Sequence, residues 1–469
     1  MAAARKLFGT DGVRGVANLE PMTAETAVRL GRVLAHLCRR NSPGRQRIVT
    51  GRDTRWSGDM LEAALAAGIC SAGLDAALAG ILPTPAMAFL THDTGAGAGA
   101  VISASHNPFQ DNGIKFFAAS GFKLPDEVEE EIERLVFSTT AAAVPPTGGD
   151  IGRVSAVEAA PTRYKEFLKT CSPGQHSLAG LKIVLDCAHG AAYRVGPELL
   201  CELGADVVVI GASPDGTNIN SGCGAVHPAG LQQAVRAEGA QLGIALDGDA
   251  DRALFVDETG TVVDGDEVLA MVAAAMLMRG TLKHATVVAT TMSNIGLDTA
   301  LRERGARLLR VQVGDRYVVE EMRRGGYNLG GEQSGHLVFL DHTTTGDGLV
   351  AALSVAGMMR ASGRPLSELK QVMRKFPQVQ LDVAVARRAE LNSLAKVRQV
   401  IDRVRAELGE RGRVVVRYSG TEALVRVMVE GEHAARVQTD AEDIAAAVRE
   451  ELGGESREGV SSPSGGGSG

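Results

Sequence analysis

The sequence predicts an α/β fold built mainly on parallel sheets, and three similar segments support this prediction. Each segment begins with a short apolar strand, continues through a small or polar turn and leads into a helical pattern. Alternating strands and helices are typical of parallel sheets, because a helix usually provides the crossover between parallel strands. These segments are residues 48–55, 183–190 and 287–294. We therefore expect three related α/β domains with mixed, mainly parallel sheets, and a smaller C-terminal α+β domain.

A chain of 469 residues is too long for one hydrophobic core, so several domains are expected. Domain boundaries should lie where the composition shifts towards Ala, Thr, Pro and Gly, or where a charged helix end meets a proline. A helix should begin at Glu267, another should occupy about 391–410, and a strand should follow at 414–418. The predicted domains cover 1–150, 151–262, 263–375 and 376–452, and a disordered Gly/Ser-rich tail covers 453–469.

The composition limits the classes of function. Aromatic residues make up 4% of the chain and the formal net charge is −7, so base-stacking surfaces and a basic nucleic-acid surface are not expected. The six cysteines form no CxxC pair, which is typical of reduced thiols in the cytoplasm. The longest uncharged apolar run, residues 268–278, is too short to cross a bilayer, and the first residues lack a signal-peptide core. We expect a cytoplasmic protein with no membrane or nucleic-acid partner.

Three aspartates occur within five residues, directly after an apolar run. Asp247, Asp249 and Asp251 follow residues 242–246, which should form a buried strand. Clustered carboxylates repel one another unless a cation binds them, and oxygen ligands suit a hard cation such as Mg²⁺. Arg252 beside them suggests that an anion binds at the same place. Because α/β sheets bind ligands at the carboxyl ends of their strands, a magnesium site is the leading interpretation.

The same acidic segment is also compatible with two other local structures. An EF-hand places carboxylates at this spacing, but it needs a glycine where Arg252 stands and helices where strands are expected. A solvated acidic hairpin turn needs no metal at all. Both structures therefore stay open as alternatives.

A second group of polar residues follows another apolar strand. This strand should end at Ser105 and His106, and Asn107 and Pro108 should then turn the chain. A hydroxyl held in this way can act as a nucleophile or, once phosphorylated, as a phosphoryl donor. Lys115 lies ten residues later, beyond a turn that can fold it back towards the serine. The alternatives are a turn-capping serine, a hydrogen-bonded histidine and a solvated surface lysine.

Other catalytic motifs fit this chain poorly. A hydrolase nucleophile elbow needs glycines where Ser103 and Asn107 stand. The glycine-rich run over 95–100 precedes a strand, whereas a dinucleotide-binding motif follows one. The chain contains no Gly-Lys dipeptide, so a Walker-type nucleotide site is not expected.

Two polar loops are candidates for binding an anion and a sugar. Residues 417–422 place a guanidinium, hydroxyls and a glycine together, which suits a phosphate dianion. Residues 330–336 combine glycines with a carboxylate, an amide and a hydroxyl, which suits sugar hydroxyls. Each loop is also compatible with an ordinary turn. Arg14 and Arg316 are further positive candidates, although a lone arginine is more often a salt-bridge residue.

Taken together, these segments resemble the α-D-phosphohexomutase superfamily. All four signature loops are present, in family order, between Leu7 and about Glu430. Within the superfamily, the chain most resembles the bacterial members that act on glucosamine phosphates. Tyr418 and Ala423 depart from the family pattern, which concerns only the fine positioning of the phosphate loop. The narrower resemblance rests on residues 7–15, 102–108, 218–220, 223–228 and Gln333, the last of which is typically Met in members that act on glucose or mannose phosphates.

The resemblance implies a four-domain molecule with its active site in a central cleft. It implies an isomerase that interconverts glucosamine 6-phosphate and glucosamine 1-phosphate, a precursor of UDP-N-acetylglucosamine and hence of peptidoglycan. The reaction would proceed through a phosphoserine enzyme and a sugar bisphosphate, which would act as both intermediate and activator. The alternative is a phosphoglucomutase or phosphomannomutase of the same superfamily. A monomer or a homodimer is expected, with one Mg²⁺ per active site.

The resemblance also implies roles for individual residues. Ser105 would carry the phosphoryl group, and one of its phosphate oxygens would bind Mg²⁺ together with Asp247, Asp249 and Asp251. Glu332 and Ser334 would bind sugar hydroxyls. The residues expected to bind the non-transferred phosphate or another part of the substrate are Arg417, Ser419, Gly420, Thr421 and Arg316. The residues expected in proton transfer or charge stabilisation are Arg14, His106, Lys115, Arg252 and His336.

Overall fold

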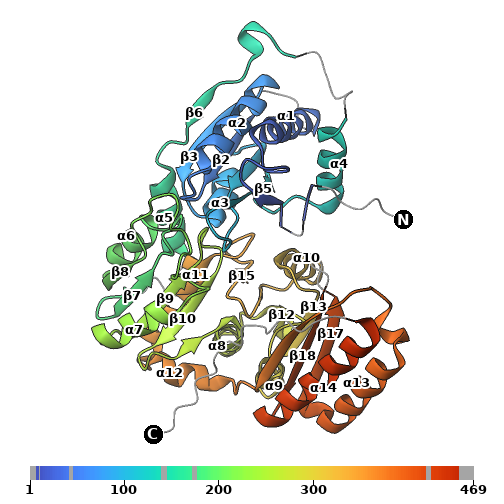
Figure 1. The fold of residues 1–469 in the computed structure, drawn as a ribbon. Coiled ribbons are helices and arrows are strands. Elements are labelled where there is room, and N and C mark those ends of the chain that lie inside the picture. The colour runs from blue at the N-terminus through green and yellow to red at the C-terminus, as the bar shows by residue number, and fades with distance from the viewer. Residues whose placement is uncertain are drawn as a thin grey trace. The chain divides into compact units, whose positions relative to one another are not determined.

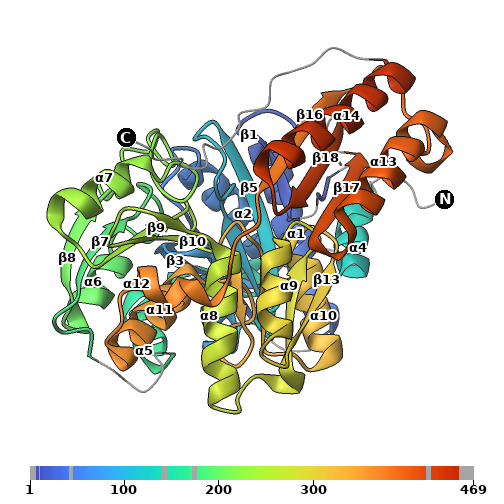
Figure 2. The ribbon, with the colours of Figure 1, turned by 90° about the horizontal axis from the view of Figure 1, so that it is seen from below.

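The computed structural model describes residues 7–9, 11–41, 46–138, 145–171, 177–418 and 424–453. The chain divides into two compact units, which are Met1–Thr290 with Ala306–Val372 and Thr291–Gly305 with Met373–Gly469. In the described residues the first unit contains three mixed sheets with helices packed on them. The second unit contains one small antiparallel sheet with its own helices (Figure 1, Figure 2).

The first sheet and its helices come from the N-terminal third of the chain: β1 Val13–Val16, α1 Ala24–Asn41, β2 Arg47–Arg52, α2 Gly58–Ser71, β3 Asp75–Ile81, α3 Thr84–Asp93, β4 Ala98–Ile102, β5 Asp111–Ala118, α4 Asp126–Val136 and β6 Val154–Ala156. The strand order is β1-β5-β4-β2-β3-β6. Strands β4, β2, β3 and β6 run parallel to one another, whereas β5 is antiparallel to both β1 and β4. The strand predicted before Ser105 is β4, and the strand of the first predicted repeat is β2.

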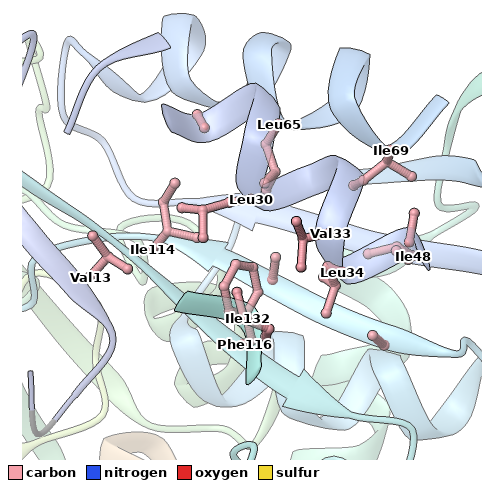
Figure 3. Packing of buried hydrophobic residues seen from close by; sticks show 14 of the residues in the cluster. Val13, Leu30, Val33, Leu34, Ile48, Leu65, Ile69, Ile114, Phe116 and Ile132 are labelled. Atoms are coloured by element: carbon pink, nitrogen blue, oxygen red, sulfur yellow. The ribbon is translucent and has the colours of Figure 1, made fainter. Parts of the chain in front are cut away.

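The core of this region lies between the sheet and the helices α1, α2 and α4 (Figure 3). Leu30 and Leu34 lie four residues apart on α1 and therefore share one face of that helix. They pack with Leu65 of α2 and Phe116 of β5, and all four residues are at most 2% exposed. Burying one such side chain contributes about 1.5–3 kcal/mol. This apolar packing fixes the strands whose ends carry the polar loops.

The second sheet and its helices comprise α5 Ala160–Thr170, β7 Lys182–Asp186, α6 Val195–Glu202, β8 Asp206–Ile210, α7 Ala229–Glu238, β9 Leu242–Leu246, β10 Ala253–Asp257 and β11 Val262–Val263. The order is β11-β10-β9-β7-β8, with β9, β7 and β8 parallel and the other two strands antiparallel. All five residues of β9 are buried, as the apolar run predicted. Because β9 and β10 form an antiparallel hairpin around the aspartates, the EF-hand alternative is excluded.

The third sheet and its helices comprise α8 Gly265–Met278, β12 Thr286–Thr290, β13 Arg307–Val311, α10 Asp315–Gly325, β14 Leu329–Gly331, β15 Leu337–Phe339, α11 Gly348–Ser362 and α12 Leu366–Leu369. Its order is β13-β12-β14-β15, and only β15 is antiparallel within these described strands. The predicted start of α8 at Glu267 is wrong by two residues. The Asp264 carboxylate accepts from the N–H of Glu267 at 3.2 Å, while the Glu267 carboxylate accepts from the N–H of Asp264 at 3.0 Å. This reciprocal cap makes Asp264 the N-cap residue, and the helix begins at Gly265.

The second unit comprises α9 Ile295–Arg302, β16 Gln378–Ala384, α13 Ala395–Leu408, β17 Gly412–Tyr418, β18 Leu424–Gly431 and α14 Ala434–Leu452. The three strands are antiparallel in the order β16-β18-β17. The helix predicted over 391–410 is shorter than expected, because 3₁₀ turns occupy Leu391–Ser393 and Gly409–Arg411 at its two ends. The strand predicted at 414–418 is the main part of β17.

The predicted fold class is confirmed, since three mixed α/β sheets precede a small α+β region. Strand β6 pairs with β3, so the first sheet extends beyond residue 150, where the first domain was predicted to end. The domain limits themselves stay a prediction. Apart from Gly453, the predicted tail lies outside the described residues. Among the residues that the structure describes, no helix combines the length and the apolar character needed to cross a membrane.

Candidate active site

Ser105 lies in the loop between β4 and β5. The residue is 1% exposed, and its backbone has a φ of 51°. A non-glycine residue in this left-handed region costs on the order of 1–3 kcal/mol and persists only where surrounding contacts fix it. One such contact is the N–H of Ser105, which donates to Ser103 Oγ at 2.9 Å. The loop is therefore held in a conformation that the chain would rarely adopt by itself.

The three predicted aspartates converge in the turn between β9 and β10. Asp247 and Asp249 are fully buried, and Asp251 is 3% exposed. One carboxylate oxygen from each lies within 4.8 Å of the others. The Oδ1 atoms of Asp249 and Asp251 are buried and accept no hydrogen bond from any described residue. Such oxygens are unfavourable unless a cation binds them, so this donor set fits a hard divalent cation and the solvated acidic turn is excluded.

The serine loop and the aspartate turn meet directly. Ser105 Oγ donates a hydrogen bond to Asp247 Oδ2 at 2.6 Å, although the two residues are 142 positions apart in the sequence. A Cβ atom at Gly248 would lie 2.6 Å from the carbonyl oxygen of Ser105, so only glycine permits this approach. Thr84 Oγ1 also donates to Asp249 Oδ2 at 2.6 Å. The two motifs that the sequence predicted separately therefore form one site.

The electrostatic surroundings differ between the aspartates. Burial, together with the charges of Asp251 and Asp249, raises the pKa of Asp247 well above its usual value. Burial acts in the same direction on Asp251, but neighbouring cations, chiefly Lys115, outweigh it and hold the pKa of Asp251 well below its usual value. A cation bound by all three carboxylates would remove the repulsion that raises the pKa of Asp247.

Lys115, on β5, is a buried cation beside the aspartates. Its Nζ lies 3.0 Å from Asp249 Oδ2, 3.5 Å from Asp251 Oδ2 and 3.0 Å from Asp11 Oδ2. The residue is 2% exposed, which excludes a solvated surface lysine. Burial acts to lower the pKa of Lys115, but these carboxylates outweigh it and raise that pKa above its ordinary value. The site thus contains a fixed positive charge.

His106 lies next to the serine hydroxyl. Its Nδ1 is 3.3 Å from Ser105 Oγ. Burial, with the charges of Arg252 and Arg14, lowers the pKa of His106 to about 4. The imidazole is therefore neutral at pH 7.

His336 is buried between two carboxylates. Its Nδ1 lies 3.7 Å from Asp251 Oδ1, and its Nε2 lies 3.5 Å from Asp315 Oδ2. Burial acts to lower the pKa of His336, but the two carboxylates outweigh it and raise that pKa. The N–H of Gly346 donates to Nε2 at 3.1 Å, which assigns the ring proton of the neutral form to Nδ1.

Two predicted arginines lie against the same loops. Arg14 Nη1 donates to the carbonyl oxygen of Ala104 at 3.4 Å, and its Nη2 pairs with Asp11. The backbone N–H of Arg252 donates to Asp247 Oδ1 at 3.2 Å, and its Nε is buried without a hydrogen-bond acceptor among the described residues. A buried donor without an acceptor is unfavourable, so an anion at this position would be stabilised.

The predicted sugar-binding turn connects β14 to β15. The chain reverses direction between Glu332 and His336 through two backbone hydrogen bonds. Glu332 Oε1 accepts from the N–H of Gly314 at 3.1 Å. Ser334 is exposed, whereas the Gln333 side chain donates to the N-cap carboxylate of α8 at 3.3 Å. The turn therefore presents part of its polar surface to solvent.

Arg316 forms ion pairs with residues of α4. Its Nη2 is 2.7 Å from Glu129 Oε1, its Nη1 contacts Asp126, and the residue is 7% exposed. Arg316 therefore has the salt-bridge role that the sequence analysis gave as the alternative for a lone arginine.

Arg417 belongs to the second unit, where it lies opposite Arg426 across β17 and β18. Burial and the charge of Arg426 lower the pKa of Arg417. Like charges on directly opposite residues repel, so an anion beside them would be favourable. The other predicted residues of this loop, which are Ser419, Gly420 and Thr421, lie outside the described residues.

Sequence reasoning did not single out the residues that hold the serine loop. Arg55 and Asp53 follow β2 and hydrogen-bond to this loop, and Asn220 donates to the carbonyl oxygen of Ser105 at 2.9 Å. A usable signal existed, because β2 and β4 are adjacent parallel strands that end at paired residues. Polar residues directly after such strands share one edge of the sheet.

The chain matches models of one protein family along most of its length. The matches are to phosphoglucomutase/phosphomannomutase alpha/beta/alpha domain I over residues 5–143, domain II over 162–260, domain III over 264–376 and the C-terminal domain over 381–447.

Curated relatives are more than half identical to the chain. The phosphoglucosamine mutase of Syntrophotalea carbinolica is 54% identical over 454 residues, which cover 97% of this chain and 99% of that protein. The phosphoglucosamine mutase of Anaeromyxobacter dehalogenans is 55% identical over 458 residues, which cover 96% of this chain and all of that protein.

Solved structures share the fold at lower identity. A phosphoglucomutase/phosphomannomutase family protein from Burkholderia thailandensis has a TM-score of 0.77 at 24% identity, and the match covers 94% of this chain and 97% of that chain. N-acetylphosphoglucosamine mutase from Aspergillus fumigatus, solved with GlcNAc-6P and magnesium, has a TM-score of 0.65 at 18% identity. The match covers 95% of this chain and 96% of that chain. The chain therefore belongs to the phosphoglucosamine mutase family within the α-D-phosphohexomutase superfamily.

Proposed function

We propose that the chain interconverts glucosamine 6-phosphate and glucosamine 1-phosphate through a phosphorylated Ser105 and a sugar bisphosphate. The observation that carries this proposal is the 2.6 Å hydrogen bond from Ser105 Oγ to Asp247, inside a buried group of carboxylates that fits a divalent cation. A protein that only bound its ligand would need no hydroxyl at this position. The names of the relatives, which are more than half identical over nearly the whole chain, support glucosamine phosphate as the substrate.

The proposed cation site consists of Asp247, Asp249 and Asp251, with one oxygen of the phosphorylated Ser105. Bound Mg²⁺ would supply positive charge that stabilises a transferring phosphoryl group. The buried Oδ1 atoms of Asp249 and Asp251, which accept no hydrogen bond from the described residues, support one cation in each site. The magnesium present in the Aspergillus fumigatus complex also supports this choice of metal.

The chain's own residues suit a balanced phosphoryl transfer. The 1-hydroxyl of glucosamine 6-phosphate attacks the phosphorus of the phosphoserine, the bond between that phosphorus and Ser105 Oγ breaks, and the sugar bisphosphate forms. The sugar hydroxyl loses its proton and Ser105 Oγ gains one. His106, whose Nδ1 lies 3.3 Å from Ser105 Oγ, would move these protons together with Lys115 and His336. In the second step Ser105 Oγ attacks the phosphorus at position 6 of the bisphosphate. The bond from that phosphorus to the sugar oxygen breaks, and glucosamine 1-phosphate is left.

Fixed positive charges also contribute to the proposed catalysis. Lys115, Arg14 and Arg252 surround the serine and aspartate loops, and Lys115 is 2% exposed. In a buried site such charges need no reorganisation when the phosphoryl group moves, so they lower the barrier more than they would in water.

Substrate contacts outside the transfer site belong to the same proposal. Glu332 and Ser334 would bind sugar hydroxyls, because their turn is partly open to solvent. Arg316 is committed to its salt bridges with α4 and adds no support as a substrate contact. A monomer or a homodimer stays a prediction. The loop proposed for the non-transferred phosphate contains Arg417, Ser419, Gly420 and Thr421.

The test compares two substrates in one assay. Purified enzyme with Mg²⁺ and a catalytic amount of sugar 1,6-bisphosphate is given glucosamine 6-phosphate or glucose 6-phosphate. We expect kcat/KM to be at least about tenfold higher for the glucosamine compound, because an amino group that pairs with the site is lost in the analogue. A preference for glucose 6-phosphate would favour the phosphoglucomutase alternative. No turnover of either compound would overturn the proposal.

A further inference from the structure

A buried ion pair lies beside the serine loop. Arg55 Nε donates to Asp53 Oδ2 at 2.9 Å, and both side chains are fully buried. Removing two charges from water is costly, and apolar residues of the same size often give equal or greater stability. The presence of this pair is therefore poorly explained by fold stability alone.

The guanidinium of Arg55 donates to backbone carbonyls along the whole serine loop. Its Nη2 donates to the carbonyl oxygens of Ser105 at 2.9 Å and Asn107 at 2.8 Å. Its Nη1 donates to the carbonyl oxygen of Asp111 at 3.0 Å and contacts that of Pro108. One rigid, planar group thus fixes the loop from the serine to the first residue of β5.

Asp53 reaches Ser105 from its other side. Asp53 Oδ2 accepts from Ser103 Oγ at 2.6 Å, and this Oγ accepts from the N–H of Ser105 at 2.9 Å. The pair therefore contacts both the N–H and the carbonyl group of the serine, directly or through one hydroxyl. These contacts account for the left-handed φ of 51° at Ser105 and leave its hydroxyl to reach Asp247.

We propose that Asp53 and Arg55 form a positioning pair that sets the orientation of Ser105 for phosphoryl transfer. This inference rests on the proposed phosphoserine function. Transfer requires the attacking oxygen, the phosphorus and the leaving oxygen to lie in line, and a displacement of about 1 Å lowers a rate about 100-fold. A lysine cannot replace the arginine, because its single ammonium nitrogen cannot reach four carbonyls in fixed geometry.

The first test is Arg55→Lys in the full-length enzyme, with Arg52→Lys as the matched control. Arg52 is the last residue of β2, the strand that precedes Arg55. Its Nε pairs with Glu62 Oε2 of α2 at 3.1 Å and not with the serine loop. We expect kcat for glucosamine 6-phosphate to fall at least about 100-fold in Arg55→Lys, with KM nearly unchanged. Arg52→Lys should keep both constants near those of the wild type. A wild-type kcat in Arg55→Lys would overturn the inference.

A second variant keeps the inference testable if Arg55→Lys does not fold. Ser103→Ala removes only the hydroxyl that links Asp53 to the N–H of Ser105. We expect kcat to fall about tenfold with KM unchanged, because one of the contacts that orient the serine is lost. A folded Ser103→Ala enzyme, checked by circular dichroism, that turns over at the wild-type rate would contradict the positioning role.

Guanidinium rescue provides a readout that a purely structural role would not change. Arg55 is one of the residues that line a surface cavity of about 720 Å³, so the space that Arg55→Ala would leave lies beside this cavity. For the Arg55→Ala enzyme, we expect guanidinium chloride, at a concentration too low to unfold the protein, to restore part of kcat. Sodium chloride at the same concentration should not restore it. Equal responses to the two salts would count against the inference.

Activity and mass measurements on the same preparations separate this inference from the proposed function. If wild-type enzyme is phosphorylated on Ser105 and Arg55→Lys keeps its full kcat, only the positioning role is wrong. If Ser105→Ala keeps its full mutase activity, the phosphoserine function itself is wrong.

Discussion

The loops that hold Ser105 and the aspartates contrast with the turn that carries Glu332 and Ser334, although all belong to the first unit. Ser105 and the three aspartates are at most 3% exposed, and contacts from distant segments fix them. In the turn, Ser334 is exposed and Glu332 is partly exposed. The site thus combines a buried, fixed part with a more open part.

This difference matches the role that we propose for each part. Phosphoryl transfer is fast only when charges and reacting atoms are aligned before the reaction begins, so its residues are held by the fold. Recognition of a sugar requires polar groups that the ligand can reach. We therefore expect substitutions in the buried part to lower kcat and substitutions in the open part to raise KM.

The largest effect is expected for Ser105→Ala, which removes the proposed phosphoryl carrier from the buried part. Mutase turnover should fall at least about 10⁴-fold, because no other described hydroxyl lies at the same contact with Asp247. Steady-state kinetics measures the loss, and thermal unfolding should show that the fold persists. Ser362→Ala, at an exposed residue of α11, is the control and should keep full activity. Wild-type turnover by Ser105→Ala would remove the basis of the comparison.

The next largest effect is expected when the cation is removed. Chelation with EDTA should inactivate the enzyme about 10²–10³-fold, and added Mg²⁺ should restore it, because the carboxylates would then lose the cation that we propose they bind. Asp249→Asn should weaken Mg²⁺ binding in calorimetric titrations. Asp257→Asn is a matched control, since this buried aspartate pairs with Lys370 at 2.6 Å instead. Full activity in exhaustively chelated buffer would show that the aspartates do not act through a metal.

A smaller effect concerns stability at a buried carboxyl with a structural role. Asp347 caps α11 and accepts from the Tyr164 hydroxyl at 2.8 Å, and burial raises its pKa to about 6 from the usual 3.8. The folded state therefore holds this proton more tightly than the unfolded state. Protonation of Asp347 contributes fully to the free energy of unfolding below pH 3.8, and this contribution is lost as pH rises through about 6. The loss is on the order of 3 kcal/mol. Denaturant unfolding of Asp347→Asn should lack this dependence between pH 4 and 6, and an unchanged pH profile would contradict the assignment.

The smallest effect is expected in the open turn. Glu332→Gln should raise KM for glucosamine 6-phosphate about tenfold, because a hydrogen bond to a charged acceptor contributes about 1.5–3 kcal/mol and a neutral amide retains part of it. Ser334→Ala should raise KM less. In both variants kcat should change less than KM. If Glu332→Gln instead lowered kcat at an unchanged KM, the distinction between the fixed and open parts would fail.

Local features of the site were predictable from the sequence. The apolar run of β9 and the adjacent aspartates identified a strand and its polar turn, since both depend on neighbouring residues. The strand before Ser105 and the turn after it were predicted for the same reason. The capping box at Asp264 and Glu267 was also local, yet the helix start was placed two residues late.

Contacts between distant segments were not predictable in the same way. Lys115 and Asp249 are 134 positions apart, and which strands bring them together depends on the packing of whole sheets. The roles of Asp53 and Arg55 were missed because a charged turn after a strand is common, and only the neighbouring β4 places it against Ser105. The resemblance to a family supplied the link between the two loops that local patterns lacked.

Peptide mapping by mass spectrometry tests the covalent route most directly. The enzyme is incubated with a sugar 1,6-bisphosphate and analysed before and after excess glucosamine 6-phosphate is added. We predict a single phosphate on Ser105 that disappears when the monophosphate accepts it. A phosphate on another residue, or a Ser105 that stays unmodified while the enzyme turns over, would contradict a phosphoserine relay.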